Sequence, residues 1–228
     1  GCRLTPARDA IMLAPHLYVD SADANAVGAL LAGSLVEGVT TNPTILQRSG
    51  RRLGDIPGLY SRWVEQGAGE VFFQTWGTDA AELLANAAPL IALGDRIVVK
   101  VPATRAGFVA TRELTERGVP VLVTAVYSAA QALAAAAYGA RYVAPYFGRL
   151  GDAGHDAVAV IGSMHRMLTG SATEVLAASL RSPADIVALR ELGVARFTAA
   201  PVVIESLLLD DVSESSAAEF EAAIRDIA

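Results

Sequence analysis

Residues 96–126 of the chain read RIVVKVPATRAGFVATRELTERGVPVLVTAV, and they give the clearest indication of how the chain folds. Two short runs rich in β-branched residues, Arg96–Val101 and Val119–Val126, flank a stretch of helical period over Arg105–Arg117. The apolar residues in these runs are continuous, as in Ile97-Val98-Val99, and do not alternate with polar ones. Continuous runs are typical of parallel strands that are buried on both faces. The stretch therefore predicts a strand, a helix and a second, parallel strand.

The same alternation repeats along the chain. Six further strands are predicted at His16–Asp20, Gly38–Asn42, Val71–Thr75, Arg141–Phe147, Glu174–Leu180 and Arg196–Ala200. Further helices are predicted at Ala22–Gly33, Pro57–Gln66, Thr78–Leu93, Ser128–Tyr138, Asp156–Leu168, Pro183–Leu192 and about Glu214–Ile227. Eight strands that each precede a helix predict an α/β fold, a single-domain (β/α)8 TIM barrel with an extra C-terminal helix. We expect this domain to span residues 12–228.

An open, doubly wound sheet is the alternative architecture for such a pattern. That fold normally carries a glycine-rich turn after its first strand. Here Asp20-Ser21-Ala22-Asp23 follows the first strand instead, and it has the composition of a strand end and a helix N-cap. The barrel is therefore the preferred prediction.

Composition excludes several classes of protein. The 228 residues are 53% hydrophobic and carry a formal net charge of −6, which argues against nucleic acid as a partner. No apolar run approaches the roughly 20 residues of a membrane span, so no membrane partner is expected. The single cysteine, Cys2, excludes an internal disulfide and a cysteine-based zinc site. We expect a soluble, cytoplasmic protein.

Residues 1–11 differ from the rest, because they show neither a helical nor a strand period. Met12 then opens the segment that runs directly into the first strand. We interpret Met12 as the natural start and residues 1–11 as a non-native or disordered segment, in which Cys2 has no functional meaning.

Nearly every predicted strand ends on a polar side chain after an apolar run. In (β/α)8 barrels the chemistry gathers at these C-terminal strand ends, so the polar residues there are the candidate site. They are Asp20, Thr40, Asn42, Gln74, Lys100, Thr124, Tyr146, Arg149, Ser179 and Arg181.

Lys100 is the strongest single candidate for a catalytic residue, since it interrupts an apolar run that would otherwise be wholly buried. Full burial can lower the pKa of a lysine by roughly 3–5 units. An amine that is partly neutral near pH 7 can attack a carbonyl group and form an imine. The alternatives are a lysine that reaches solvent or one that pairs with Asp20.

The other candidates fit imine chemistry. Asp20 is suited to acid–base work in forming the imine, Gln74 and Thr124 to holding a catalytic water, and Tyr146 to handling the proton of a cleaved hydroxyl. Arg149, Ser179 and Arg181 offer the charge and donors that a phosphate requires. Each also has an ordinary interpretation, as a helix cap for Asp20, a core hydroxyl for Tyr146 and solvated surface charges for the arginines.

Metal and nucleotide motifs are not found. His16, His155 and His165 lack the spacing of a metal-binding helix, so no metal site is expected. The glycine-rich segment 148–154 matches neither a P-loop nor a dinucleotide-binding pattern.

Several segments together resemble the transaldolase family, most closely its small members, the fructose-6-phosphate aldolases and short transaldolases. They are Leu17-Tyr18-Val19-Asp20-Ser21, Gly38-Val39-Thr40-Thr41-Asn42-Pro43-Thr44, Val98-Val99-Lys100-Val101-Pro102, Thr124-Ala125-Val126-Tyr127, Tyr142-Val143-Ala144-Pro145-Tyr146 and Leu176-Ala177-Ala178-Ser179. The resemblance covers about Leu17 to the C-terminus.

The resemblance implies a class I aldolase mechanism on a (β/α)8 barrel, with Lys100 as the Schiff-base lysine and Asp20 as the acid–base group. It implies that Thr40 and Asn42 bind substrate and that Thr124 helps to position the catalytic water. It places the phosphate group at Arg149, Ser179 and Arg181, the last being Arg where relatives have Lys. It implies no metal or organic cofactor, sugar phosphates as small-molecule partners, and a homo-oligomer in which the C-terminal helix packs onto a neighbour.

Two residues bear on the subclass. Transaldolases resemble one another in having Glu at the position of Gln74 and Phe at that of Tyr146, whereas fructose-6-phosphate aldolases have Gln and Tyr. The sequence therefore favours reversible cleavage of fructose 6-phosphate to dihydroxyacetone and glyceraldehyde 3-phosphate. Phe147-Gly148-Arg149-Leu150 is more similar to the short transaldolases, so transfer of a dihydroxyacetone unit is the nearest alternative. A non-catalytic barrel that binds sugar phosphates is a more distant one.

Overall fold

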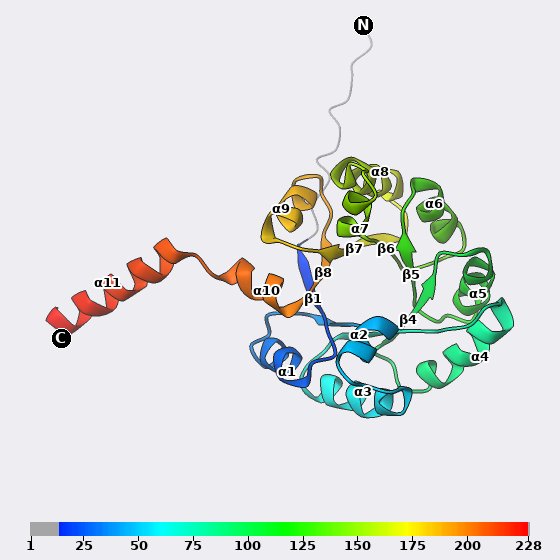
Figure 1. Cartoon of the computed structure of the whole chain (residues 1–228), viewed down its shortest axis with the longest axis horizontal. Helices are drawn as coiled ribbons and strands as arrows, with labels where there is room; N and C mark the ends of the chain where they lie inside the picture. The colour runs from blue at the N-terminus through cyan, green and yellow to red at the C-terminus, as the bar shows by residue number, and fades with distance from the viewer. Residues whose placement is uncertain (1–13, 228) are drawn as a thin grey trace, which may run out of the picture.

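Eight parallel strands pair in chain order, and the last pairs with the first, so that the sheet closes into a barrel (Figure 1). The computed structural model describes residues 14–227. The strands are β1 His16–Asp20, β2 Gly38–Thr40, β3 Glu70–Gln74, β4 Ile97–Pro102, β5 Val121–Val126, β6 Tyr142–Pro145, β7 Glu174–Leu180 and β8 Arg196–Ala199. The predicted barrel is confirmed. The interpretation of residues 1–11, with Cys2 and Met12, lies outside the described residues.

Helices surround the barrel, one after nearly every strand. They are α1 Ala24–Ala32, α2 Pro43–Arg48, α3 Ile56–Glu65, α4 Ala80–Ile91, α5 Arg105–Glu116, α6 Ala129–Ala137, α7 Phe147–Asp152, α8 Ala157–Leu168, α9 Pro183–Glu191, α10 Pro201–Leu208 and α11 Asp211–Ile227. A 3-10 turn, η1 Leu53–Asp55, precedes α3.

The eight predicted helices are present, and four of them begin later than predicted because a capping residue precedes them. Asp23, Asp79, Ser128 and Asp156 have extended backbones, and their side chains accept hydrogen bonds from the first turn of the following helix. A capping residue lies directly before the first helical residue, so a prediction that includes the cap places the start of the helix too early.

Two predicted strand ends are wrong. The strand predicted at Gly38–Asn42 stops at Thr40, because Asn42 caps the unpredicted helix α2 through a hydrogen bond from Ile45 N to its Oδ1 (2.9 Å). The strand predicted at Arg141–Phe147 stops at Pro145, and Phe147 begins α7. These two helices have six residues each, too few for a helical period to be recognised. A third unpredicted helix, α10, has eight residues.

The apolar interior has two parts. Outside the sheet, strand residues such as Val99 and Val123 pack against the helices. Inside the barrel a smaller layer of buried side chains fills the lumen, comprising Tyr18, Phe72, Val98, Leu122, Tyr142, Ala144, Leu176 and Ala178. The barrel is thus filled by side chains, as (β/α)8 barrels generally are.

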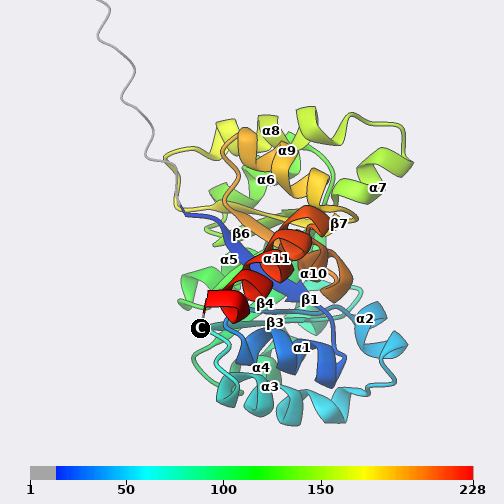
Figure 2. The same cartoon turned by 90° about the vertical axis from the view of Figure 1, so that its left-hand side faces the viewer.

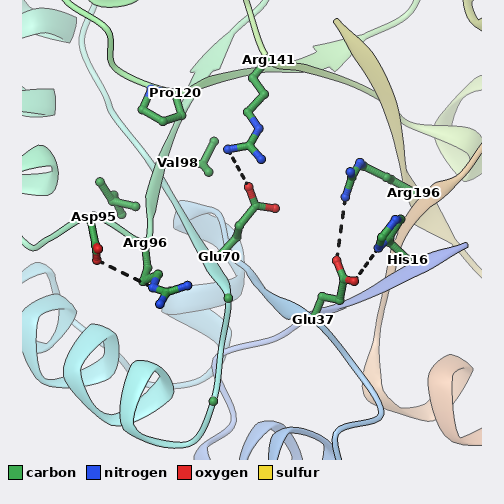
Figure 3. A pocket seen from close by; sticks show the side chains of 12 residues that line it. His16, Glu37, Glu70, Asp95, Arg96, Val98, Pro120, Arg141 and Arg196 are labelled. Atoms are coloured by element: carbon green, nitrogen blue, oxygen red, sulfur yellow. Dashed lines mark hydrogen bonds and ion pairs between the residues drawn. The ribbon is translucent and has the colours of Figure 1, made fainter. Parts of the chain in front are cut away.

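Charged groups close the N-terminal end of the barrel (Figure 3). The hydroxyls of Tyr18 and Tyr142 both donate to Glu70, at 2.8 Å and 3.1 Å, and Arg141 forms an ion pair with Glu70. Arg196 Nε donates to Glu174 Oε2 at 2.9 Å. A cavity of about 620 Å³ opens here. Its wall consists largely of acidic and basic side chains that form ion pairs with one another. We therefore do not assign the active site to this cavity.

The C-terminal helix α11 stands apart from the barrel. It extends away from the barrel in Figure 1 and points toward the viewer in Figure 2, and none of its residues is buried. Its start at Asp211 is slightly earlier than the predicted Glu214. Between residues 14 and 227, no helix combines the length and the apolar character needed to cross a membrane.

Candidate active site

The candidate residues are brought together at the C-terminal end of the barrel by the alternation of side chains along each strand. A residue two positions after one that fills the lumen also points inward. The pairs are Tyr18 with Asp20, Phe72 with Gln74, Val98 with Lys100, Leu122 with Thr124, and Ala144 with Tyr146. The strand register also places Asp20 opposite Thr40, and Gln74 opposite Lys100. A polar layer therefore lies directly above the apolar filling.

Lys100 is buried, with 4% of its surface exposed. Its Nζ donates a hydrogen bond of 2.6 Å to the backbone carbonyl of Thr41. Burial lowers the pKa of the Lys100 ammonium, and the attraction of the Asp20 carboxylate partly opposes this effect. The predicted alternative in which Lys100 extends into solvent is therefore wrong.

The lysine content of the chain also distinguishes Lys100. It is the one lysine in the chain, since the other members of the 18 Lys and Arg residues are all arginines. Arginine stays protonated at any physiological pH and cannot form an imine, whereas a buried lysine can lose its proton. A chain that otherwise uses only arginine for positive charge has its single ε-amine inside the barrel.

Asp20 lies at the end of β1, half-buried beside Thr40. Its Oδ1 accepts a hydrogen bond of 2.6 Å from Thr40 Oγ1. Burial raises the pKa of the Asp20 carboxyl, while Lys100 and the bond from Thr40 act in the opposite direction. Asp20 does not cap a helix, because Asp23 performs that role for α1.

Tyr146 directly follows β6 and lies beside Thr124 of the neighbouring strand β5, with 2.8 Å between the two hydroxyl oxygens. Burial raises the pKa of the Tyr146 phenol, so the group is protonated near neutral pH. Tyr127 packs edge-on against the Tyr146 ring at 6.0 Å between centroids, and the Arg149 guanidinium lies 5.2 Å from the ring centroid. Thr124, Tyr127 and Arg149 therefore all contribute to fixing the position of the Tyr146 side chain.

The proposed phosphate residues have different surroundings. Ser179 has a φ of +57° at a bulge in β7, where the register with β8 shifts between Ala177 and Leu180. Arg181 forms a two-pronged ion pair with Asp152, with bonds of 2.8 Å and 2.6 Å. This pair lowers the pKa of the Asp152 carboxyl. Arg181 thus carries an acidic partner, whereas Arg149 rests on the Tyr146 ring.

Asn42 and Gln74 lie on the opposite side of the mouth from these arginines, on the segments of β2 and β3. Capping of α2 uses Asn42 Oδ1, so its amide nitrogen is the group available to a ligand. Gln74 lines a cavity of about 740 Å³ together with Pro43, Thr44 and Trp76. This cavity reaches the polar layer at Gln74, the neighbour of Lys100 in the strand register.

Thr198 on β8 belongs to this polar layer and was not among the predicted residues. Its Oγ1 lies 2.6 Å from Thr40 Oγ1, and it is buried. The signal was a polar residue following Phe197 near the end of a strand, the same pattern that identified the other candidates. Over residues 14–227, no group of three or more His, Cys, Asp and Glu residues is arranged to hold a metal ion.

The arrangement supplies what imine chemistry requires. It has a buried amine with a lowered pKa, a carboxyl group with a raised pKa nearby, and a protonated phenol across the mouth. Such groups can add an amine to a carbonyl and move protons between the intermediates.

Residues 17–227 match the family model described as transaldolase/fructose-6-phosphate aldolase. A probable transaldolase of Phenylobacterium zucineum (strain HLK1) is 36% identical over 207 residues, which cover 90% of this chain and 94% of that one. A probable transaldolase of Moorella thermoacetica (strain ATCC 39073 / JCM 9320) is 33% identical, with 90% and 95% covered.

Solved structures support the fold alone. A mandelate oxidase variant superimposes with a TM-score of 0.59 at 17% identity, over 82% of this chain and 66% of that one. At this identity the likeness concerns only the barrel. The sequence relatives carry the assignment, and by them the chain belongs to the transaldolase/fructose-6-phosphate aldolase family of enzymes.

Proposed function

We propose that this enzyme is a cytoplasmic class I aldolase that reversibly cleaves fructose 6-phosphate to dihydroxyacetone and glyceraldehyde 3-phosphate. The observation that carries the proposal is the surroundings of Lys100, which is buried, has a lowered pKa, and lies in the same polar layer as Asp20 and Tyr146. Burial favours the neutral form of an amine, which is the nucleophilic form.

The reaction begins when Lys100 Nζ adds to the C2 carbonyl of the ketose. Asp20 transfers protons so that the carbinolamine loses water and becomes an iminium ion. The iminium accepts the electron pair of the C3–C4 bond as this bond breaks. The proton of the C4 hydroxyl passes through water to the Tyr146 hydroxyl, which relays a proton to the Asp20 carboxylate, and the aldehyde leaves.

The second half returns the enzyme to its starting state. The enamine left on Lys100 takes a proton at C3 by way of Tyr146, which yields the iminium of dihydroxyacetone. Water held by Gln74 and Thr124 adds to this iminium, and Lys100 is released as the amine. Thr40 and Asn42 bind the hydroxyls of the donor.

The phosphate is assigned to the opposite part of the mouth, at Arg149, Ser179 and Arg181. Arginine suits a phosphate because its donors match the oxygen atoms in a planar, two-pronged arrangement. Arg181 is already paired with Asp152, whereas Arg149 has no ion-pair partner among the described residues, so Arg149 supplies the available positive charge of the set.

Borohydride trapping tests the proposal. The protein is incubated with fructose 6-phosphate and sodium borohydride, and its intact mass and tryptic peptides are measured. The expected result is a reduced sugar-phosphate or dihydroxyacetone adduct on the peptide that contains Lys100. Lys100→Met is the control and should show no adduct on that peptide and no turnover. If wild-type protein binds the sugar phosphate without any adduct, imine chemistry is excluded and a non-catalytic binding barrel is the better account.

A true transaldolase is the second candidate. The relatives reported above carry that name, and the segment Phe147-Gly148-Arg149-Leu150 resembles short transaldolases. Tyr146 and Gln74 favour the aldolase instead, because a phenol adds a proton donor for the enamine and an amide removes a charge beside the water. Release of dihydroxyacetone from fructose 6-phosphate alone would support the aldolase. Turnover only when an aldose phosphate acceptor is added would support the transaldolase.

A further inference from the structure

Three side chains from three strands form a continuous chain of hydrogen bonds in the polar layer. Thr198 Oγ1 on β8 lies 2.6 Å from Thr40 Oγ1 on β2, and Thr40 Oγ1 lies 2.6 Å from Asp20 Oδ1 on β1. Thr40 and Thr198 are buried, so their hydroxyls depend on one another and on Asp20 for hydrogen bonds.

Counting protons gives these bonds their direction. An ionised carboxylate only accepts hydrogen bonds, and each threonine hydroxyl has one proton to donate. Thr40 must therefore donate its proton to Asp20, and the bond between the two threonines must use the proton of Thr198. Both hydroxyl dipoles then point toward the carboxylate, and a chain of donors strengthens each bond in it.

We propose that Thr198 is a positioning residue for Asp20, which acts through Thr40 by fixing the direction of the Thr40 hydroxyl and stabilising the ionised carboxylate. Thr40 lies between Thr198 and Asp20 in this chain of hydrogen bonds. Thr198 therefore does not act as a catalytic residue itself. The inference rests on the proposed role of Asp20 in imine formation.

Other charged and titratable groups also face Asp20, and they influence the pKa of its carboxyl independently of Thr198. The Lys100 ammonium on β4 attracts it electrostatically, and Tyr146 faces it from the segment after β6, with Arg149 close to the Tyr146 ring. None of these contacts Thr198 through a hydrogen bond within the described part of the chain. A change at Thr198 should therefore reach Asp20 through Thr40.

The experiment compares Thr198→Val, which removes the hydroxyl at nearly constant volume, with Thr198→Ser, which keeps it. The carboxyl group of Asp20 is titrated by carbon-13 NMR of protein labelled at aspartate, with Asp20→Asn to assign the signal. The pH profile of kcat for cleavage of fructose 6-phosphate is measured in parallel. Thr198→Ala provides a second hydroxyl-free variant if the valine protein does not fold.

Thr111→Val is the matched control. Thr111 is a fully buried threonine on α5 whose hydroxyl has no hydrogen-bond partner among residues 14–227. The same chemical change there should therefore affect stability without reaching Asp20.

In Thr198→Val the Asp20 titration and the acid limb of the kcat profile should both move to higher pH, by about half a unit or more. Thr198→Ser should restore wild-type values, and Thr111→Val should leave both unchanged. An unchanged Asp20 titration in the hydroxyl-free variants would overturn the inference, as would a serine variant that behaves like valine. The NMR titration needs no turnover, so it still tests the coupling if wild-type protein gives no borohydride adduct and the proposed function fails.

Discussion

Lys100 is subject to two opposed influences on its pKa. Burial lowers the pKa of the ammonium, and the Asp20 carboxylate raises it. Removing the charge of Asp20 leaves burial unopposed, so in Asp20→Asn the pKa of Lys100 should fall further below the ordinary lysine value.

This shift can be measured without turnover. The rate at which trinitrobenzenesulfonate labels Lys100 depends on the fraction of neutral amine, so its rise with pH should occur at lower pH in Asp20→Asn than in wild-type protein. The single lysine makes the signal unambiguous once the reaction of the terminal amine is subtracted. A rise displaced to higher pH would contradict the electrostatic account.

Tyr146 is the residue on which the balance between cleavage and transfer depends. Tyr146→Phe removes the phenol that Thr124 holds at 2.8 Å, so the enamine loses its proton donor. We expect release of dihydroxyacetone to fall roughly 10²-fold or more, within the range for a general acid–base group. Transfer to an added aldose phosphate should fall less. Retention of full cleavage by the variant would exclude this role.

At the scale of elements, α7 and the bulge in β7 pack through a glycine. A Cβ added at Gly148 would lie 2.5 Å from Arg181 Nε and 2.8 Å from the carbonyl oxygen of Ser179. Gly148→Ala should therefore displace the phosphate side of the mouth. We expect KM for fructose 6-phosphate to rise with a smaller change in kcat, and stability to fall by about 1–3 kcal/mol.

The same helix offers the control for this prediction. A Cβ at Gly151 would meet no atom of residues 14–227 within 4 Å, so Gly151→Ala should leave KM unchanged. Steady-state kinetics would measure KM and kcat of the two variants, and thermal unfolding would measure their stability. Equal effects in both would show that helix propensity, and not the contact with Arg181, is responsible.

The sequence predicts the strands well because their apolar runs end at the polar residues of the site. Val98 and Lys100, or Leu122 and Thr124, are related by the two-residue repeat of a strand, so periodicity alone brings them to one layer. Short helices such as α2 escape prediction because six residues contain fewer than two turns. The pairing of Arg181 with Asp152 also escapes it, since the partner lies 29 residues away on another element.

At the scale of the whole molecule, α11 has an apolar face without a partner in the described chain. Phe220 and Ile224 are 68% and 57% exposed and lie one helical turn apart. The homo-oligomer expected from the family resemblance would cover this face with a second copy. We predict that Phe220→Glu combined with Ile224→Glu lowers the oligomeric state.

Ala222→Glu, on the opposite face of α11, is the matched control and should leave the oligomeric state unchanged. Light scattering coupled to size-exclusion chromatography measures the mass of each variant. Equal masses for the double variant and wild-type protein would show that α11 does not hold the subunits together.

The single lysine has a consequence for chemical durability. Free aldehydes condense slowly with exposed ε-amines, the process of glycation, and the proposed reaction releases such an aldehyde. The exterior of this barrel offers arginines in place of lysines, and its one ε-amine is buried at Lys100. Prolonged exposure to glyceraldehyde 3-phosphate should therefore add imine-derived mass only at Lys100 and the terminal amine. Reduction with cyanoborohydride followed by intact mass measurement would count these adducts, and the protein would tolerate its own product at concentrations that modify lysine-rich proteins at many positions.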